Sequence, residues 1–228
     1  MSARLAILIA AFPIAAAAQV GHRPENSPFN DVSRRPRLTL FGGWYSAATD
    51  EAGVFPQAAP LLGGRVDVLV GGPADVFLRF GHIATERTVI DPTKSAGERF
   101  LETRDVTLGF ADLGLSFSLT GAKSWRNIVP TLNAGIGLVS DFKGVDPGGF
   151  KHATTFSFGY GLGIRYHKPA SRLSFRGDIG SYMYSLEYPV SYYTPAGDGT
   201  SVLPQGTPRS QWRNNWTMTF GVSYYVFR

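Results

Sequence analysis

The C-terminal segment, 216–226, alternates strictly between two kinds of side chain. Large apolar or aromatic residues occupy every second position: Trp216, Met218, Phe220, Val222, Tyr224 and Val226. Small or polar residues fill most of the positions between them: Thr217, Thr219, Gly221, Ser223 and Tyr225. A strand with one apolar face and one small polar face is typical of a transmembrane β-barrel, in which one face contacts lipid and the other faces the lumen.

The N-terminus has the three-part layout of a secretory signal peptide. A short basic start, 1–4, precedes an apolar run, 5–14, and the small residues 16–18. The run is too short for a transmembrane helix, which needs about 20 apolar residues. We therefore expect a signal peptide over 1–18, a polar periplasmic lead-in over 19–36 and a single barrel domain over 37–228.

Composition excludes several function classes. The chain has no cysteine, which rules out disulfides, thiolate zinc sites and a cysteine nucleophile. Its formal net charge of +5 is spread along the chain without a Lys/Arg cluster, so we expect no nucleic-acid partner. We also expect no cofactor.

Seven further segments alternate in the same manner as the C-terminal one. They lie at about 38–46, 63–70, 75–83, 106–119, 131–140, 156–167 and 172–184. The connections after the odd-numbered segments are long and those after the even-numbered ones are shorter, as in outer-membrane barrels with long external loops and short periplasmic turns. The pattern predicts an all-β fold: an eight-stranded antiparallel up-and-down transmembrane β-barrel.

The segment at 106–119 departs from simple alternation. Its apolar residues change parity between Phe110 and Leu113. A β-bulge near Ala111 and Asp112 would produce that change, because a bulge inserts one extra residue into a strand.

Three other folds fit the sequence less well. A soluble lipocalin-like barrel would have an outer face rich in lysine and glutamate, whereas the polar face here consists mainly of glycine, serine and threonine with a few arginines. A periplasmic β-sandwich would not require long and short connections to alternate. A helical membrane protein would need a long apolar run, and none follows the expected signal peptide.

The end of the chain also resembles a known assembly signal. The spacing of Thr219, Gly221, Tyr224 and Val226 is similar to the C-terminal signal of bacterial outer-membrane barrels. Together with the opening Leu38-Thr39-Leu40-Phe41-Gly42-Gly43, it makes the chain resemble the small eight-stranded barrels of the outer-membrane protein A transmembrane-domain and protein X type. The resemblance implies an outer-membrane location, contact with outer-membrane lipid and recognition by the assembly machinery. It implies no catalytic residues.

Alternation places a set of polar residues in the lumen. They are Arg65, Asp67, Arg79, Asp112, Asn133, Arg165, Arg176 and Asp178. Eight strands enclose a lumen that side chains just fill, and charges in such a space must pair. We expect a structural plug of salt bridges. A gated ion path through the same residues is the alternative.

Aromatic residues gather near both ends of the expected strands. Such residues form girdles at the two membrane interfaces, because their rings are apolar and their tips polar. The predicted interfacial set is Trp44, Trp125, Tyr166, Tyr184, Trp212 and Trp216.

The function expected from these features is a structural, adhesion or surface-interaction role. External loops rich in tyrosine and turn residues, above all the last, could bind a surface protein or a glycan. A narrow channel for small solutes is the alternative. A lipid A-modifying enzyme is the third possibility, but it needs His with Ser at the outer rim, and His152-Ala153-Thr154 has the wrong hydroxyl residue.

Overall fold

The computed structural model describes residues 27–33, 35–142 and 144–226. The expected signal peptide, 1–18, lies outside the described residues, as do 19–26 of the lead-in and the last two residues of the chain. Within the part that the structure describes, no helix has the length and apolar character needed to cross a membrane.

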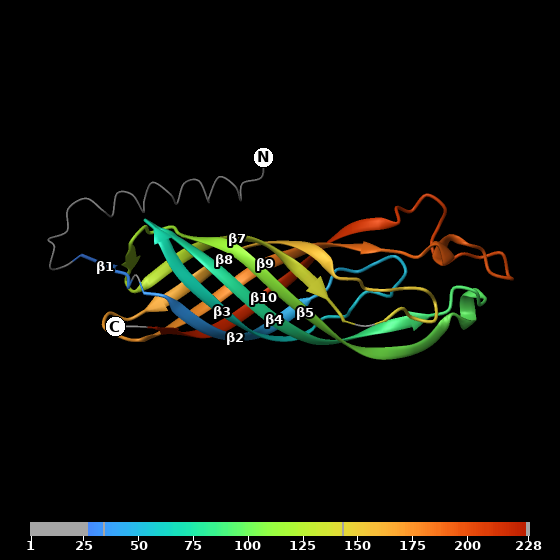
Figure 1. Cartoon of the computed structure of the whole chain (residues 1–228), viewed down its shortest axis with the longest axis horizontal. Helices are drawn as coiled ribbons and strands as arrows, with labels where there is room; N and C mark the ends of the chain where they lie inside the picture. Colours follow the sequence, from blue (N-terminus) through green and yellow to red (C-terminus); the bar gives the residue numbers. More distant parts are fainter. Residues whose placement is uncertain (1–26, 34, 143, 227–228) are drawn as a thin grey trace, which may run out of the picture.

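Eight long antiparallel strands close into a barrel (Figure 1). They are β2 (Arg37–Ser46), β3 (Ala59–Gly71), β4 (Ala74–Ile90), β5 (Phe100–Ser118), β7 (Ile128–Ser140), β8 (Thr155–His167), β9 (Leu173–Glu187) and β10 (Ser210–Tyr225). The ring closes where β10 pairs with β2, from Trp216 opposite Ser46 to Tyr225 opposite Arg37. Closure pairs the backbone groups that lipid cannot satisfy. The predicted fold is confirmed.

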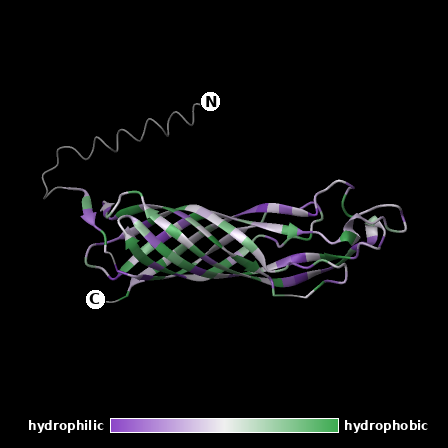
Figure 2. Cartoon of the chain, turned by 45° about the horizontal axis from the view of Figure 1, so that its top comes forward, coloured by the Kyte–Doolittle hydropathy of each residue, from purple (hydrophilic) through white to green (hydrophobic). Residues whose placement is uncertain are grey.

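Apolar side chains cover the outside of the barrel. Leu40 is 70 % exposed, Leu162 62 % and Phe220 61 %, although all three are strongly hydrophobic. Each alternates along its strand with a small or inward-facing residue, so green and paler bands alternate over the barrel wall in Figure 2. A continuous apolar belt of this kind is stable when lipid surrounds it.

The connections differ at the two ends of the barrel. Loops L1 (47–58), L2 (91–99), L3 (141–154) and L4 (188–209) lie at one end, and the turns 72–73, 119–127 and 168–172 lie at the other (Figure 1). L2 contains the 3-10 helix η2 (Ala96–Glu98), and L4 contains η3 (Val190–Tyr193). The long–short alternation predicted from sequence is present, with longer strands and shorter loops than expected.

Two short strands at the turn end were not expected. The lead-in contributes β1 (Phe29–Asp31), which pairs with β6 (Lys123–Trp125) in the middle turn. β6 joins β7 through Arg126 and Asn127, whose φ values of 48° and 69° are both positive. Two positive φ values are typical of the type I′ hairpin turn.

The predicted β-bulge near Ala111 and Asp112 is wrong. β5 keeps one register against β4 through this region, with Phe110 opposite Gly81 and Asp112 opposite Arg79. The even-numbered residues face inward along the whole stretch from Val106 to Ser116. The hydrophobic pattern changes parity because the surroundings change along the strand. β5 begins in the outer region, where its inward-facing residues up to Phe110 pack into an apolar interior, and it then enters the lipid-facing region, where its outward-facing residues from Leu113 on are apolar.

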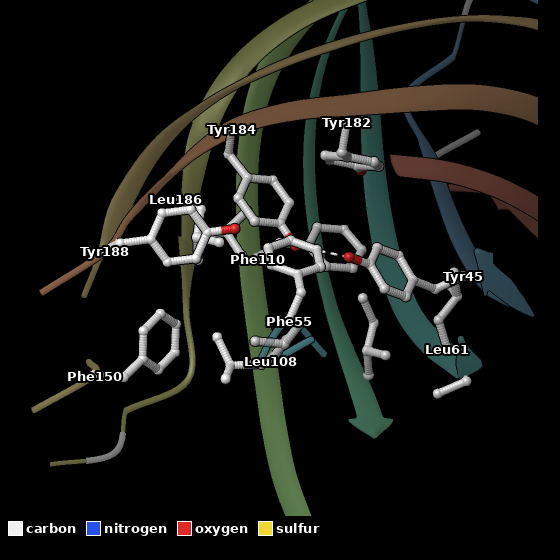
Figure 3. Close-up of a cluster of buried hydrophobic side chains, with 14 of the residues drawn as sticks. Tyr45, Phe55, Leu61, Leu108, Phe110, Phe150, Tyr182, Tyr184, Leu186 and Tyr188 are labelled. Atoms are coloured by element: carbon white, nitrogen blue, oxygen red, sulfur yellow. Dashed lines mark hydrogen bonds between the residues drawn. The ribbon is translucent and has the colours of Figure 1, made fainter. Parts of the chain in front are cut away.

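That apolar interior forms a plug at the loop end of the barrel. Figure 3 shows rings from the barrel wall and from the loops packed together. We call this cluster the aromatic plug. Its buried members are Tyr45, Val54, Phe55, Ala59, Leu61, Ile83, Ile90, Leu108, Phe110, Val139, Phe150, Tyr182, Tyr184, Leu186, Tyr188, Tyr192 and Leu203.

Candidate functional site

The lumen below the aromatic plug holds a network of buried charges. Arg65 donates from Nε and Nη2 to Asp67 Oδ1 at 2.9 and 2.7 Å. Arg176 donates from Nε to Asp178 Oδ2 at 2.6 Å and from Nη2 to Asp178 Oδ1 at 2.8 Å. Asn133 Oδ1 accepts from Nη2 of Arg176 at 2.9 Å and from Nη2 of Arg65 at 3.3 Å. One amide therefore bridges the two ion pairs.

A second centre lies nearer the plug. Arg79 Nε donates to Asp112 Oδ2 at 2.9 Å, and the Tyr182 hydroxyl donates to the same oxygen at 2.7 Å. The Arg79 guanidinium also lies 4.8 Å from the centre of the Tyr182 ring. Tyr182 thus belongs to both the charged lumen and the aromatic plug, and joins the two regions.

The turn end of the lumen contains charges that the sequence prediction missed. Arg37 pairs with Asp75, and its Nη2 also lies 3.8 Å from Asp67. Arg165 approaches Asp75 only at 3.8 Å, and its Nε and Nη1 have no hydrogen-bond partner among the described residues. Asp75 and Arg37 lie two positions before Phe77 and Thr39, which face the lumen. The same alternation, extended toward the turn end, therefore predicts that both charges face inward.

The lumen has little free space around these groups. A cavity beside Arg79 and Asn133 has a volume of about 20 Å³, and one beside Phe110 and Tyr184 about 10 Å³. Such volumes are those of single water molecules. The charges are therefore held by one another and by packing, as a structural plug requires.

The aromatic plug closes the loop end of the lumen. Phe55 from L1 stacks on Tyr184 of β9 with ring centres 5.6 Å apart, and the Tyr184 hydroxyl is hydrogen bonded to that of Tyr45 at 2.7 Å (Figure 3). Tyr184 is only 1 % exposed. Its predicted place in the interfacial girdle is therefore wrong: in β9 it shares the inward parity of Tyr182.

The other predicted interfacial residues lie on the outside. Trp44, Trp125, Tyr166, Trp212 and Trp216 are between 43 % and 52 % exposed. Trp212 packs against Phe158 near the loop end, and Trp125 lies in β6 at the turn end. A girdle role for these five remains a prediction.

The four residues of the resembled assembly signal lie along or just after the end of β10. Thr219 and Gly221 face inward, Tyr224 faces outward and is 42 % exposed, and β10 ends at Tyr225. The Val226 N–H then donates to the Pro36 carbonyl at 2.9 Å. Recognition of this segment by assembly machinery remains a proposal.

Above the plug, the loops are joined into one cap. Arg99 of L2 donates to the Thr200 and Ser201 carbonyls of L4 at 2.7 and 3.0 Å, and Asp198 accepts from the Ala96 N–H at 2.9 Å. Hydrogen bonds to the charged form of Asp198 lower the pKa of its carboxyl group to about 2.

A buried ion cluster anchors L3 beneath this cap. Arg87 of β4 is fully buried and pairs with Asp146 of L3. Arg104 of β5 binds the other Asp146 oxygen at 2.8 Å. The sequence pattern predicts an external loop for Asp146, where the structure has it. It also predicts loop positions for Arg87 and Arg104, which instead lie in β4 and β5, because these strands continue beyond the lipid-facing part of the barrel.

Comparisons with known proteins agree with this architecture. No protein-family model and no curated protein matches the sequence. The outer membrane protein OprG from Pseudomonas aeruginosa is similar in structure, with a TM-score of 0.50 and 13 % identity over 86 % of this chain and 98 % of OprG. A major outer membrane protein from Thermus thermophilus has a TM-score of 0.40 and 12 % identity over 83 % of this chain and 98 % of its own. Ail, the attachment invasion locus protein of Yersinia pestis, has a TM-score of 0.39 and 13 % identity over 83 % of this chain and 99 % of its own. At these identities the likeness to OprG concerns the fold alone, which is that of a small outer-membrane β-barrel.

Proposed function

We propose that this protein is a sealed outer-membrane barrel that presents a rigid external cap for structural and surface-interaction roles such as adhesion. One observation carries the proposal: the lumen is filled over its length by ion pairs and then by the aromatic plug, while β4, β5, β9 and β10 continue past the lipid belt into the cap. A barrel built to conduct would keep an open path. A barrel built to display loops needs the anchoring seen here.

The β4–β5 hairpin supplies a surface for a protein partner. The ladder between β5 and β7 ends at Gly109 opposite Ser140, while β5 continues to Phe100. Among the described residues, the β7-facing side of this outer part of β5 has no ladder partner. Phe100 and Leu101 on it are 61 % and 44 % exposed. A free strand edge with apolar side chains favours addition of an extended segment of another protein.

The channel alternative has little support. Cavities the size of one water lie along the charged lumen, and Phe55 with its neighbours closes the outer end. Conduction would require both regions to rearrange.

The enzymatic alternative lacks a site among the described residues. Catalysis by a hydroxyl nucleophile needs a base hydrogen bonded to it. His82 lies on the outward face of β4, and both ring nitrogens of His152 lack a partner. His167 lies at the turn end, where its ring packs against Tyr225 and its Nδ1 has no partner in the described part of the chain. His22 lies outside the described residues.

Two measurements test the proposal. Purified protein in planar lipid bilayers is expected to give no conductance steps, whereas a Phe55→Ser variant, which opens the plug, serves as the comparison. Bacteria producing the protein are expected to attach to cultured epithelial cells, and Leu101→Asp is expected to reduce attachment. Val145→Asp is the control, because Val145 is an exposed apolar residue of L3, 63 % accessible. Steady single-channel conductance by the unaltered protein, without attachment, would contradict the proposal.

A further inference from the structure

The outer parts of β4 and β5 form a two-stranded ribbon that extends past the rest of the barrel wall (Figure 1). β3 pairs with β4 only as far as Ile83, and β7 pairs with β5 only as far as Gly109. L1 covers the β4 edge of the ribbon, where the Gln57 N–H donates to the Glu86 carbonyl at 2.8 Å. Among the described residues, no third segment makes a backbone hydrogen bond to the β5 edge over 101–107.

The backbone groups of odd-numbered residues point to this free edge of β5. At the turn end of the strand, the Ser118 N–H donates to a carbonyl on the β4 side, and the Leu119 N–H donates to one on the β7 side, each at 2.9 Å. β5 keeps one register against β4 as far as Glu102, so the same alternation holds along the strand. Thr103 and Asp105 therefore present unpaired N–H and C=O groups, which can add another strand.

The side chains along this edge carry charges of both signs. Glu102 and Arg104 lie on one face of the ribbon, with side chains 51 % and 35 % exposed. Thr103 lies between them and is exposed on the other face. When a second β5 edge pairs antiparallel about Thr103, Glu102 of each copy lies directly opposite Arg104 of the other. Opposite charges at such positions stabilise an antiparallel pair, whereas like charges destabilise it.

The same charges disfavour the neighbouring registers. Antiparallel pairing matches residues whose backbone groups point the same way, so a symmetric pairing of identical edges is centred on one residue. A centre at Glu102 or Asp105 would oppose two carboxylates, and a centre at Arg104 would oppose two guanidinium groups. Among the registers centred within 102–105, only the one about Thr103 places opposite charges face to face.

Symmetry determines how the second copy is oriented. Two identical strands in one antiparallel sheet are related by a twofold axis perpendicular to that sheet. The ribbon continues the barrel wall, so this axis is roughly parallel to the membrane plane (Figure 1). Half a turn about such an axis inverts the second barrel. The two barrels therefore belong to two facing membranes.

We propose that the free edge of β5 pairs with the same edge of a second copy of this chain in a facing membrane, centred on Thr103. The inference deepens the proposed surface-interaction function and rests on it, because it names the partner of the β4–β5 hairpin. The pairing is short, since Leu101 has no counterpart in β4 and bulges out of the regular edge. Many copies on each membrane compensate for a weak single contact, because the first pair raises the effective concentration for the next.

Clustering of phospholipid vesicles that carry the folded full-length protein, with its loops outward, tests the pairing. Light scattering should rise with time for the unaltered protein. It should rise about fivefold more slowly, or less, for Glu102→Arg, which places a cation opposite Arg104 of the second copy. Glu187→Arg is the matched control: it removes an exposed carboxylate that pairs with an arginine at the same end of the barrel, but on β9. No clustering by the unaltered protein, or equal rates for the two variants, would overturn the proposal.

A cysteine at the centre of the pairing tests its register, because the chain has no cysteine of its own. Opposite residues of a hydrogen-bonded antiparallel pair have Cα atoms about 5.5 Å apart, which suits a disulfide. Thr103→Cys should therefore form a cross-linked dimer on mild oxidation. Asp105→Cys is the control: its position is also exposed, but the two copies of it lie four residues apart along the ladder, about 13 Å. Equal cross-linking of the two variants would show that the register is wrong.

Mixing two vesicle populations tests the orientation. One population carries Thr103→Cys with a tag that slows its migration on gels, and the other carries the untagged variant. Cross-linked dimers of one tagged and one untagged chain are expected, whereas dimers of like chains alone would place both copies in one membrane and overturn the proposal. The inference and the proposed function can also fail separately. Attachment to epithelial cells without vesicle clustering overturns only the self-pairing, and clustering by a conducting, non-adherent barrel overturns only the function.

Discussion

Arg176 offers the sharpest test of the charged lumen. Its side chain is 3 % exposed and makes two hydrogen bonds to Asp178 and one to Asn133. Methionine has a similar length and no donor, so Arg176→Met leaves the Asp178 carboxylate with the Asn133 amide, at 3.2 Å, as its remaining side-chain donor. Removing one partner of a buried ion pair costs about 3–5 kcal/mol. Because the Asp178 side chain is 17 % exposed, we expect a loss near the lower end, about 3 kcal/mol.

Urea unfolding from lipid vesicles, followed by tryptophan fluorescence, measures this loss. With a slope of about 2 kcal/mol per M, the midpoint should fall by about 1.5 M. Arg209→Met is the matched control: its pair with Glu187 is 54 % and 71 % exposed, so its loss should stay below about 1 kcal/mol. Adding Asp178→Asn to Arg176→Met should restore part of the stability, because no unpaired charge remains. Equal midpoints for the two single variants would refute the buried-pair reasoning.

Three further predictions concern the pairing of β2 with β10 that closes the barrel, the end of β10, and a histidine of L3. Gly43→Ala would press a Cβ against the Met218 carbonyl oxygen of β10 and should destabilise barrel closure by about 1–3 kcal/mol. On SDS gels of unboiled samples, the compact band should then disappear at a lower temperature than for the unaltered protein. Gly64→Ala is the control and should not have this effect, because the nearest atom to its added Cβ is 3.8 Å away. Tyr224→Arg should lower the folded amount in outer membranes more than Leu173→Arg, which lies directly opposite and faces lipid too; equal amounts would remove the evidence for an assembly signal. Burial lowers the pKa of His152 below its ordinary 6.5, so the unfolded chain takes up the proton first as the pH falls, and stability should decrease from about pH 6.5 toward the folded-state pKa. The drop in urea midpoint between neutral and mildly acidic pH should be smaller in His152→Phe. An unchanged drop would mean that another group causes it; the charges that act on the His152 pKa are those of Asp141, which raises it, and Arg87, which lowers it.

Much of the barrel could be predicted from local pattern. In 156–167, large apolar residues alternate with glycine, serine, arginine and histidine, because lipid lies on one face and a narrow lumen on the other. A strand with two such different faces has a period of two, whatever its neighbours are. The same pattern placed Arg65, Arg79 and Asn133 inside, where the structure has them. It also indicated the alternation of long and short connections.

The partners of these residues depend on the tertiary structure. Asp112 accepts from Arg79 of β4 and Tyr182 of β9, and the second partner lies 70 positions away along the chain. No local pattern specifies such a pairing, because it follows from the register of several strands and the closure of the ring.

The medium on each side of a strand is decided by the tertiary structure as well. Alternation identifies two faces of β5 and β9, yet it does not say where lipid ends and the external cap begins. Alternation alone therefore predicts a bulge beside Phe110 and an interfacial position for Tyr184, although both side chains pack inside the barrel. The loops bring Phe55, Phe150 and Tyr192 over the open end, which makes that part of the interior apolar. By itself, then, the sequence determined the two-faced strands, and the packing of distant loops decided what each face contacts.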